Sequence, residues 1–140
     1  MNDHTIALVR ESFDLIEPIA PQAGAMFYAN LLEADPVLHA LFTHEIGVPG
    51  EALMKLIGVA VLHLDQPEVL MPLLDELGRR HAGYGVRDAQ YDTVGAVLLK
   101  TLYQVLGVAY NAEVEEAWVD VYGVVATRMK SAAAAAPVSV

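Results

Sequence analysis

Apolar side chains recur every three or four residues along nearly the whole chain, which is the spacing of one face of an α-helix. The first such stripe, Ile6, Val9, Phe13 and Ile16, precedes Pro18, which lacks the N–H group that would continue a helix. The sequence contains no competing run of alternating apolar and polar residues typical of a half-buried strand. It therefore predicts an all-α fold of six to eight helices joined by short connections.

Capping residues and helix breakers divide these stripes into segments. Asp35, Asp88 and Asn111 are residue types that cap helix N-termini, and Gly107 is typical of a helix end. Pro72 is expected to open the helix that follows the break at residues 65–67. The side chains expected to face inward from residues 23–32 are Met26, Phe27 and Leu31.

The length of 140 residues suits one domain, which we place at residues 1–131, followed by a flexible alanine-rich tail at residues 132–140. The chain is 55% hydrophobic with a mean hydropathy of +0.39, yet its longest uncharged apolar stretch, residues 56–64, is too short to span a bilayer. Membrane insertion is therefore not expected. The excess apolar surface indicates either an oligomer interface or an apolar ligand, and a monomer and a homodimer both remain open.

Charge and cysteine content exclude several classes of function. Eight Lys and Arg against eighteen Asp and Glu give a formal charge of −10, which repels phosphate backbones and argues against nucleic acid as a partner. The absence of cysteine excludes disulfides, thiolate metal sites, thiol catalysis and covalent cofactor attachment through CxxCH. No HExxH motif, phosphate loop or catalytic triad is present, and no signal peptide is visible, so a cytoplasmic location is expected.

One histidine stands on an apolar stripe. Leu70, Leu74, Leu77 and His81 are four, three and four residues apart, so all four lie on the same helical face. A neutral imidazole that faces the core can serve as the axial ligand of a buried flat metallocofactor, although a core histidine satisfied by hydrogen bonds is the alternative. The other four histidines have no metal-site spacing, and we expect them at the surface: His4, His39, His44 and His63.

Several segments together carry a family resemblance. They are FYANLL at 27–32, DPVLHALF at 35–42, ALM at 52–54, LGRRHAGYG at 77–85, YDTVGAVLL at 91–99 and AWVDVYGV at 117–124.

In this order the segments resemble those of the globins, specifically the bacterial single-domain type related to the haem domain of flavohaemoglobins. The resemblance implies a globin fold packed around a buried, noncovalently held haem b. It also implies that His81 is the proximal ligand of the haem iron. The other ring nitrogen of His81 then has a natural acceptor in the carbonyl of Leu77, one turn earlier.

The resemblance also assigns the walls of the haem pocket. Tyr28 matches the distal tyrosine, whose phenol stabilises bound oxygen more than carbon monoxide; a buried tyrosine bonded to a backbone carbonyl is the alternative. Phe42 matches the phenylalanine that stacks on the porphyrin. Arg80 matches a basic residue near a haem propionate, although a solvated arginine is equally consistent with its position. The other residues assigned to haem binding are Leu53, Ile57, Leu77, Tyr91, Val94 and Leu98.

Two departures from the family pattern bear on chemistry. Where related proteins commonly place glutamine or histidine in the distal wall, the alignment puts Pro49, which offers no hydrogen bond; a register slip by one residue brings Val48 or Gly50 there instead. The distal pocket is then expected to be dry, with Leu53 beside the gas ligand. On the proximal side, the glutamate of flavohaemoglobins falls at Ala133, which argues against strong activation of the O–O bond.

These assignments lead us to expect a gas-binding haem protein rather than an enzyme, with oxygen, carbon monoxide and nitric oxide as ligands. The first alternative is a nitric oxide dioxygenase that depends on a separate reductase, because no flavin or nicotinamide domain follows in this sequence. The second is a globin used as a sensor or interaction module. A further possibility is that His44 coordinates the ferric iron as a sixth ligand.

Overall fold

The computed structural model describes residues 2–46 and 50–135, and these contain helices and no strand. The all-α prediction is therefore confirmed for the described residues. The helices are α1 (Asp3–Ile16), η1 (Glu17–Ile19), α2 (Ala20–Ala34), α3 (Pro36–Ala40), the π-helical turn η2 (Leu41–Ile46), α4 (Gly50–Leu62), α5 (Pro67–Gly83), α6 (Asp88–Leu106), η3 (Gly107–Ala109) and α7 (Ala112–Ala134).

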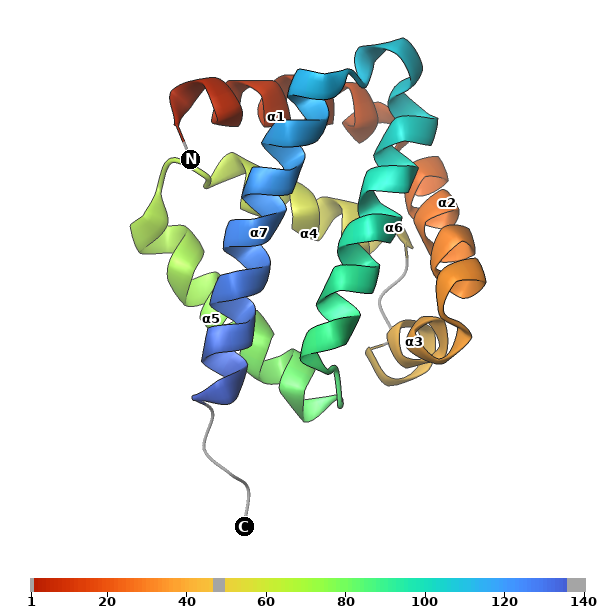
Figure 1. The fold of residues 1–140 in the computed structure, drawn as a ribbon, viewed down its shortest axis with the longest axis vertical. Helices are drawn as coiled ribbons and strands as arrows, with labels where there is room; N and C mark the ends of the chain where they lie inside the picture. The colour runs from red at the N-terminus through yellow and green to blue at the C-terminus, as the bar shows by residue number, and fades with distance from the viewer. Residues whose placement is uncertain (1, 47–49, 136–140) are drawn as a thin grey trace.

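Two long helices, α6 and α7, run side by side, and the other helices are arranged around them (Figure 1). α1 lies across one end of this pair and packs against α7. α5 packs along α7, while α2 packs against both α4 and α6. The short α3 continues from α2 at the end of the molecule opposite α1.

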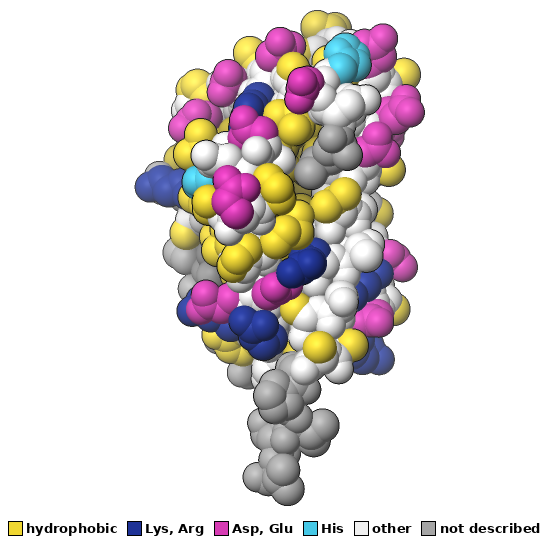
Figure 2. Space-filling model, turned by 90° about the vertical axis from the view of Figure 1, so that its left-hand side faces the viewer, with side chains coloured by type: hydrophobic (Ala, Val, Ile, Leu, Met, Phe, Trp, Pro, Cys, Tyr) yellow, Lys and Arg dark blue, Asp and Glu magenta, His cyan; other side chains and the backbone are white. Residues whose placement is uncertain are grey.

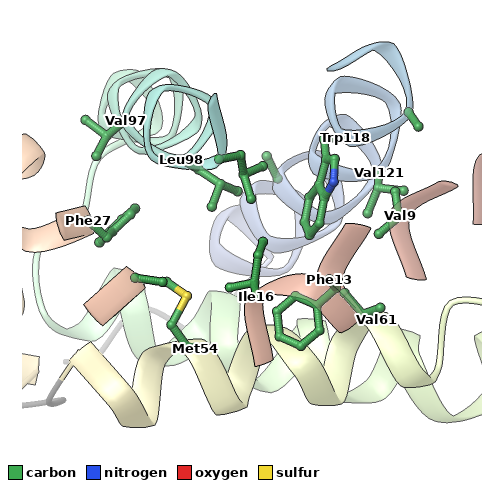
Figure 3. Close-up of a cluster of buried hydrophobic side chains, with 14 of the residues drawn as sticks. Val9, Phe13, Ile16, Phe27, Met54, Val61, Val97, Leu98, Trp118 and Val121 are labelled. Carbon is green, nitrogen blue, oxygen red and sulfur yellow. The ribbon is translucent and has the colours of Figure 1, made fainter. Parts of the chain in front are cut away.

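The main core is formed where α1, α2, α4, α6 and α7 meet, and it consists almost entirely of aliphatic and aromatic side chains (Figure 3). Its one indole, Trp118, donates a 2.8 Å hydrogen bond to the hydroxyl of Ser12, which in turn donates to the carbonyl oxygen of Val9. These bonds satisfy the polar atoms that α1 and α7 bury against each other. The labelled core residues include Ile16, Phe27, Met54, Leu98 and Trp118.

The caps expected from the sequence are correct at two of three helices. The carboxylate of Asp35 accepts from the N–H of Leu38 at 3.1 Å, and the amide oxygen of Asn111 accepts from the N–H of Val114 at 2.9 Å. The cap at Asp88 is wrong, because Asp88 is the first helical residue of α6. Gly107 does end α6, at a φ of +57° that favours glycine.

Two other local predictions are corrected. Pro72 does not open α5; the helix begins at Pro67 and passes through Pro72, and the burial of Leu70 and Leu74 on either side outweighs the missing backbone hydrogen bond. Met26 does not face the core, because it is 36% exposed, whereas Phe27 is buried. α7 continues to Ala134; residues 136–140 of the expected tail lie outside the described residues, and the domain end at residue 131 stays a prediction.

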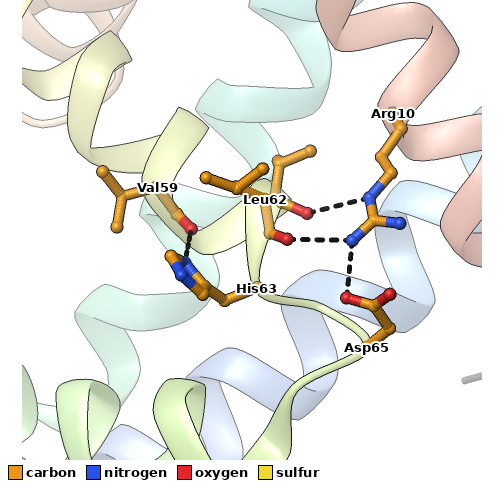
Figure 4. A network of polar contacts seen from close by, with 6 residues as sticks. Arg10, Val59, Leu62, His63 and Asp65 are labelled. Atoms are coloured by element: carbon orange, nitrogen blue, oxygen red, sulfur yellow. Dashed lines mark hydrogen bonds and ion pairs between the residues drawn. The ribbon is translucent and has the colours of Figure 1, made fainter.

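The carboxyl end of α4 is held by a side chain from α1 (Figure 4). Arg10 donates to the carbonyl oxygens of Val61 and Leu62 at 3.3 and 2.9 Å, and to the carboxylate of Asp65 at 2.8 Å. Cationic groups are favoured near the carboxyl end of a helix, where carbonyl groups lack intrahelical donors. Arg10 therefore fixes the point at which the chain leaves α4 toward α5.

Several large hydrophobic side chains remain exposed on the surface. Figure 2 shows hydrophobic side chains gathered in the middle of one face, with charged side chains around them. Among the described residues Val37, Leu62 and Tyr103 are 74%, 64% and 63% exposed. None of the described helices combines the length and apolar character that crossing a bilayer requires.

Candidate functional site

An apolar cavity of about 170 Å³ lies between α4, α5, α6 and α7. That space is about ten times what one water needs, so it suits an organic ligand. The lining residues that the site assignment included are Phe42, Leu53, Ile57, Leu77, His81, Tyr91, Val94 and Leu98. These eight side chains, from η2, α4, α5 and α6, therefore line one cavity.

His81 supplies a ring nitrogen that can bind a metal. Its Nδ1 lies 2.7 Å from the carbonyl oxygen of Leu77, one turn earlier in α5. Because a carbonyl oxygen only accepts, Nδ1 carries the proton, and in the neutral ring Nε2 keeps its lone pair. The hydrogen bond expected from the sequence is therefore present.

The environment of His81 favours this neutral form. Burial lowers the pKa of the imidazole below its ordinary value, and the hydrogen bond to Leu77 opposes this shift only in part. At neutral pH the ring therefore stays uncharged and Nε2 stays available. Since a metal ligand must be deprotonated at the coordinating atom, the side chain is prepared for that role.

The chemistry around His81 suits a metal that brings most of its own ligands. The described residues contain no group of three or more His, Cys, Asp or Glu side chains that could hold a bare ion. A haem iron receives four nitrogens from its porphyrin and needs one axial imidazole in an apolar pocket. The residues present therefore fit a haem better than a protein-bound metal ion.

Two aromatic rings flank His81. The ring centroids of Phe42, from η2, and His81 are 6.2 Å apart, and the two ring planes make an angle of 71°. The ring centroids of Tyr91, from α6, and His81 are 6.4 Å apart, and the two ring planes make an angle of 32°. The buried Tyr91 hydroxyl has no hydrogen-bond partner within the described part of the chain, while the Tyr91 carbonyl accepts from the hydroxyl of Tyr122 at 2.5 Å.

Tyr28 does not line this cavity, in contrast to its neighbour Phe27. Its half-buried ring contacts Phe27, with ring centroids 5.8 Å apart, and His39, with ring centroids 6.1 Å apart. Burial raises the pKa of the Tyr28 phenol, so the hydroxyl stays protonated and can donate a hydrogen bond. His39 is half-buried, as His63 is, and His4 is exposed.

Three other assigned residues lie apart from the cavity lining or outside the described structure. Arg80 is exposed and forms an ion pair with Glu76 at 2.7 Å. Pro49, like Val48, lies outside the described residues, so the register of the distal wall stays a prediction. The side chain of His44 is also outside them.

Part of the cavity lining was not predicted from the sequence. α7 contributes six side chains to the lining; helical spacing marks four of them only as core residues, and Ala126 and Met129 were not predicted to face inward. What placed them at the cavity is the approach of α7 to α5, which no local pattern encodes. The lining residues from α7 are Trp118, Val121, Tyr122, Val125, Ala126 and Met129.

Comparisons with known proteins agree with the fold. The sequence model described as Globin matches residues 25–129. A Danio rerio neuroglobin is 31% identical over 137 residues, covering 87% of this chain and 86% of the neuroglobin. A Bordetella parapertussis flavohemoprotein is 31% identical over 120 residues, covering 84% of this chain and 30% of the relative. The chain thus spans about a third of the length of the flavohemoproteins it matches.

Solved structures show the same fold. A bacterial globin from Campylobacter jejuni superposes with a TM-score of 0.80 at 20% identity, covering 95% of this chain and 96% of the other. A flavohemoglobin from Malassezia yamatoensis, determined with bound FAD and heme, gives a TM-score of 0.78 at 23% identity and covers 95% of this chain and 36% of the other.

Proposed function

Because the chain belongs to the globin family, we propose that it holds haem b noncovalently in the cavity and reversibly binds oxygen and other diatomic gases there. The observation that carries the proposal is the state of His81. It lies at an apolar cavity, its Nδ1 is bonded to the Leu77 carbonyl, and its pKa is lowered by burial. A ring held in this way presents one basic nitrogen in a fixed direction.

The chain's own residues position the haem and keep its pocket dry. Haem b, when bound, would supply an iron able to bind a diatomic gas. His81 Nε2 is the proposed axial ligand, and Phe42, Leu53 and Ile57 exclude water from the gas side. Arg80 is the proposed contact for a haem propionate; its ion pair with Glu76 is exposed and therefore weak enough to exchange.

Tyr28 is the proposed hydrogen-bond donor to oxygen. Its pKa is raised, so the phenol remains a donor across the physiological pH range. Oxygen accepts a hydrogen bond more strongly than carbon monoxide does, because it gains more negative charge on binding. Tyr28→Phe is therefore expected to speed oxygen release about five- to a hundredfold, on the basis of about 1–3 kcal/mol for such a bond, with little effect on carbon monoxide.

Replacement of His81 tests the haem site. We expect His81→Gly to lose haem or to bind it with a shifted Soret band, and added imidazole to restore the spectrum by filling the space of the lost ring. His63→Gly is a matched control, because His63 also bonds through Nδ1 to a carbonyl one turn earlier, that of Val59, but does not line the cavity (Figure 4). Normal haem retention with an unchanged spectrum in His81→Gly would refute the assignment.

A second candidate function is nitric oxide dioxygenation with a separate reductase, which the similarity to flavohemoproteins favours. The two functions differ in turnover. The oxygenated protein is mixed with nitric oxide, and its recovery in the presence of NADH and cell extract is followed by absorbance. Repeated cycles with nitrate formation support the enzyme, whereas a single reaction without recovery supports oxygen binding as the principal function.

A further inference from the structure

The ring of Tyr28 rests against His39 at the corner between α2 and α3. The ring centroids are 6.1 Å apart and the planes are 87° apart, which is an edge-to-face contact. Such an arrangement is attractive for aromatic rings, because the positive edge of one meets the negative face of the other. In this position Tyr28 is not part of the cavity lining, although Phe27 beside it is.

His39 is presented to Tyr28 by a well-anchored helix. Its N–H donates to the carbonyl of Asp35 at 2.9 Å, and its carbonyl accepts from the hydroxyl of Thr43 at 3.0 Å. The carboxylate of Asp35 caps the same helix, and Leu38 is fully buried beside His39. The backbone of His39 is therefore fixed, and its ring meets Tyr28 in a defined place.

We propose that His39 sets the oxygen affinity of the protein by holding the Tyr28 ring in the α2–α3 corner, in competition with the gas ligand. The proposal rests on the function proposed above. For the phenol to reach a ligand in the cavity, the Tyr28 ring must leave His39. A competing contact lowers the population of the binding-competent position and so weakens the stabilisation of oxygen.

The size of the effect follows from the strength of one aromatic pair. Contacts of this kind shift an equilibrium by about two- to tenfold. Removing the contact in His39→Ala is therefore expected to slow oxygen dissociation by about two- to tenfold. Carbon monoxide dissociation should stay unchanged, because that ligand gains little from the phenol. His39→Phe retains a ring for the edge-to-face contact and should keep the rate of the original protein.

A double-mutant cycle shows whether the effect passes through Tyr28. In the Tyr28→Phe background, replacing His39 by alanine should no longer slow oxygen release, because the hydroxyl that gains from the rotation is gone. His63→Ala is the control for the loss of an imidazole elsewhere and should leave both gas rates unchanged. An equal slowing by His39→Ala with and without the Tyr28 hydroxyl would overturn the proposal.

Nuclear magnetic resonance of the carbon monoxide complex gives a readout that does not depend on gas kinetics. Since carbon monoxide attracts the phenol weakly, the Tyr28 ring should remain in the corner and give nuclear Overhauser effects to the ring protons of His39. These contacts should weaken in the oxygen complex, and in the carbon monoxide complex of His39→Phe they should reappear with the new ring. Their absence in the carbon monoxide complex would overturn the proposal.

The outcomes separate this inference from the proposed function. If Tyr28→Phe speeds oxygen release but His39→Ala leaves it unchanged or also speeds it, the competition is refuted and the proposed function stands. If Tyr28→Phe leaves oxygen release unchanged, the role of Tyr28 as donor fails, and the competition fails with it. Tyr28→Phe and His39→Ala should both retain haem, because neither side chain lines the cavity.

Discussion

The helix that carries His81 is set against α7 by a glycine, and this contact allows a quantitative test. At Gly78, a Cβ atom would lie 2.3 Å from the carbonyl oxygen and 2.8 Å from the Cα atom of Met129. Ordinary contacts of a Cβ atom begin at 3.4 Å, so α5 and α7 would have to separate by about 1 Å to admit Gly78→Ala. The opposing atoms are backbone, which cannot turn aside as a side chain can.

Two opposing effects determine the stability of Gly78→Ala. Alanine in place of glycine within a helix stabilises by up to about 1 kcal/mol, while overpacking in a close interface costs about 1–3 kcal/mol. Gly83→Ala is the matched control, because Gly83 ends the same helix with nothing within 4 Å of its Cβ position. The helix preference favours alanine in both variants, so Gly78→Ala should be the less stable by about 1–3 kcal/mol.

Urea unfolding of the haem-free proteins, followed by far-ultraviolet circular dichroism, measures this difference. The same separation of α5 from α7 displaces His81, one turn after Gly78, so haem loss from Gly78→Ala should be faster than from Gly83→Ala. Transfer of haem to an excess of apomyoglobin measures that rate. Equal unfolding free energies for the two variants would show that α5 does not depend on the contact at Gly78 and would refute the reasoning.

Three further predictions concern polar groups. The guanidinium of Arg128 holds the pKa of Asp75 below its usual value. The ion pair therefore stabilises the fold above the unfolded pKa of Asp75, and this stabilisation is lost as the pH falls through the lower folded pKa. In Asp75→Asn, the free energy of unfolding measured in urea should fall less steeply below about pH 4. Arg10→Met should speed hydrogen exchange at the carboxyl end of α4, because the last carbonyls lose their donor. In the haem-free protein Tyr122→Phe should cost about 1–3 kcal/mol in urea unfolding, whereas Tyr91→Phe removes a hydroxyl unpaired among the described residues and should cost less.

Features that depend on neighbouring residues were predicted well from the sequence. The caps at Asp35 and Asn111 each join residues three apart, and the hydrogen bond from His81 to Leu77 spans one helical turn. Such contacts follow from residue type and helical spacing alone. Pro72 shows the limit of this reasoning, since the burial of its neighbours overrode a strong local preference.

Two contacts between residues of different helices were not predicted. The approach of Gly78 to Met129 joins residues 51 positions apart, and the contact of Tyr28 with His39 joins two helices around a corner. In sequence terms His39 has no pattern that distinguishes it from a surface histidine. Its ring meets Tyr28 at the corner between α2 and α3, where Leu38 is buried and Asp35 caps α3.

The two properties of His81 that suit it to bind a metal also differ in whether they depend on neighbouring or on distant residues. A metal-binding imidazole needs a proton on one nitrogen and a lone pair on the other. The acceptor that holds the proton on Nδ1, the Leu77 carbonyl, belongs to the same helix as His81 and is therefore a local feature. The low pKa that preserves the lone pair comes from burial, and that burial requires α4, α6 and α7 to close around α5. The orientation of the histidine is thus a property of one helix, whereas its readiness to bind a metal is a property of the whole fold.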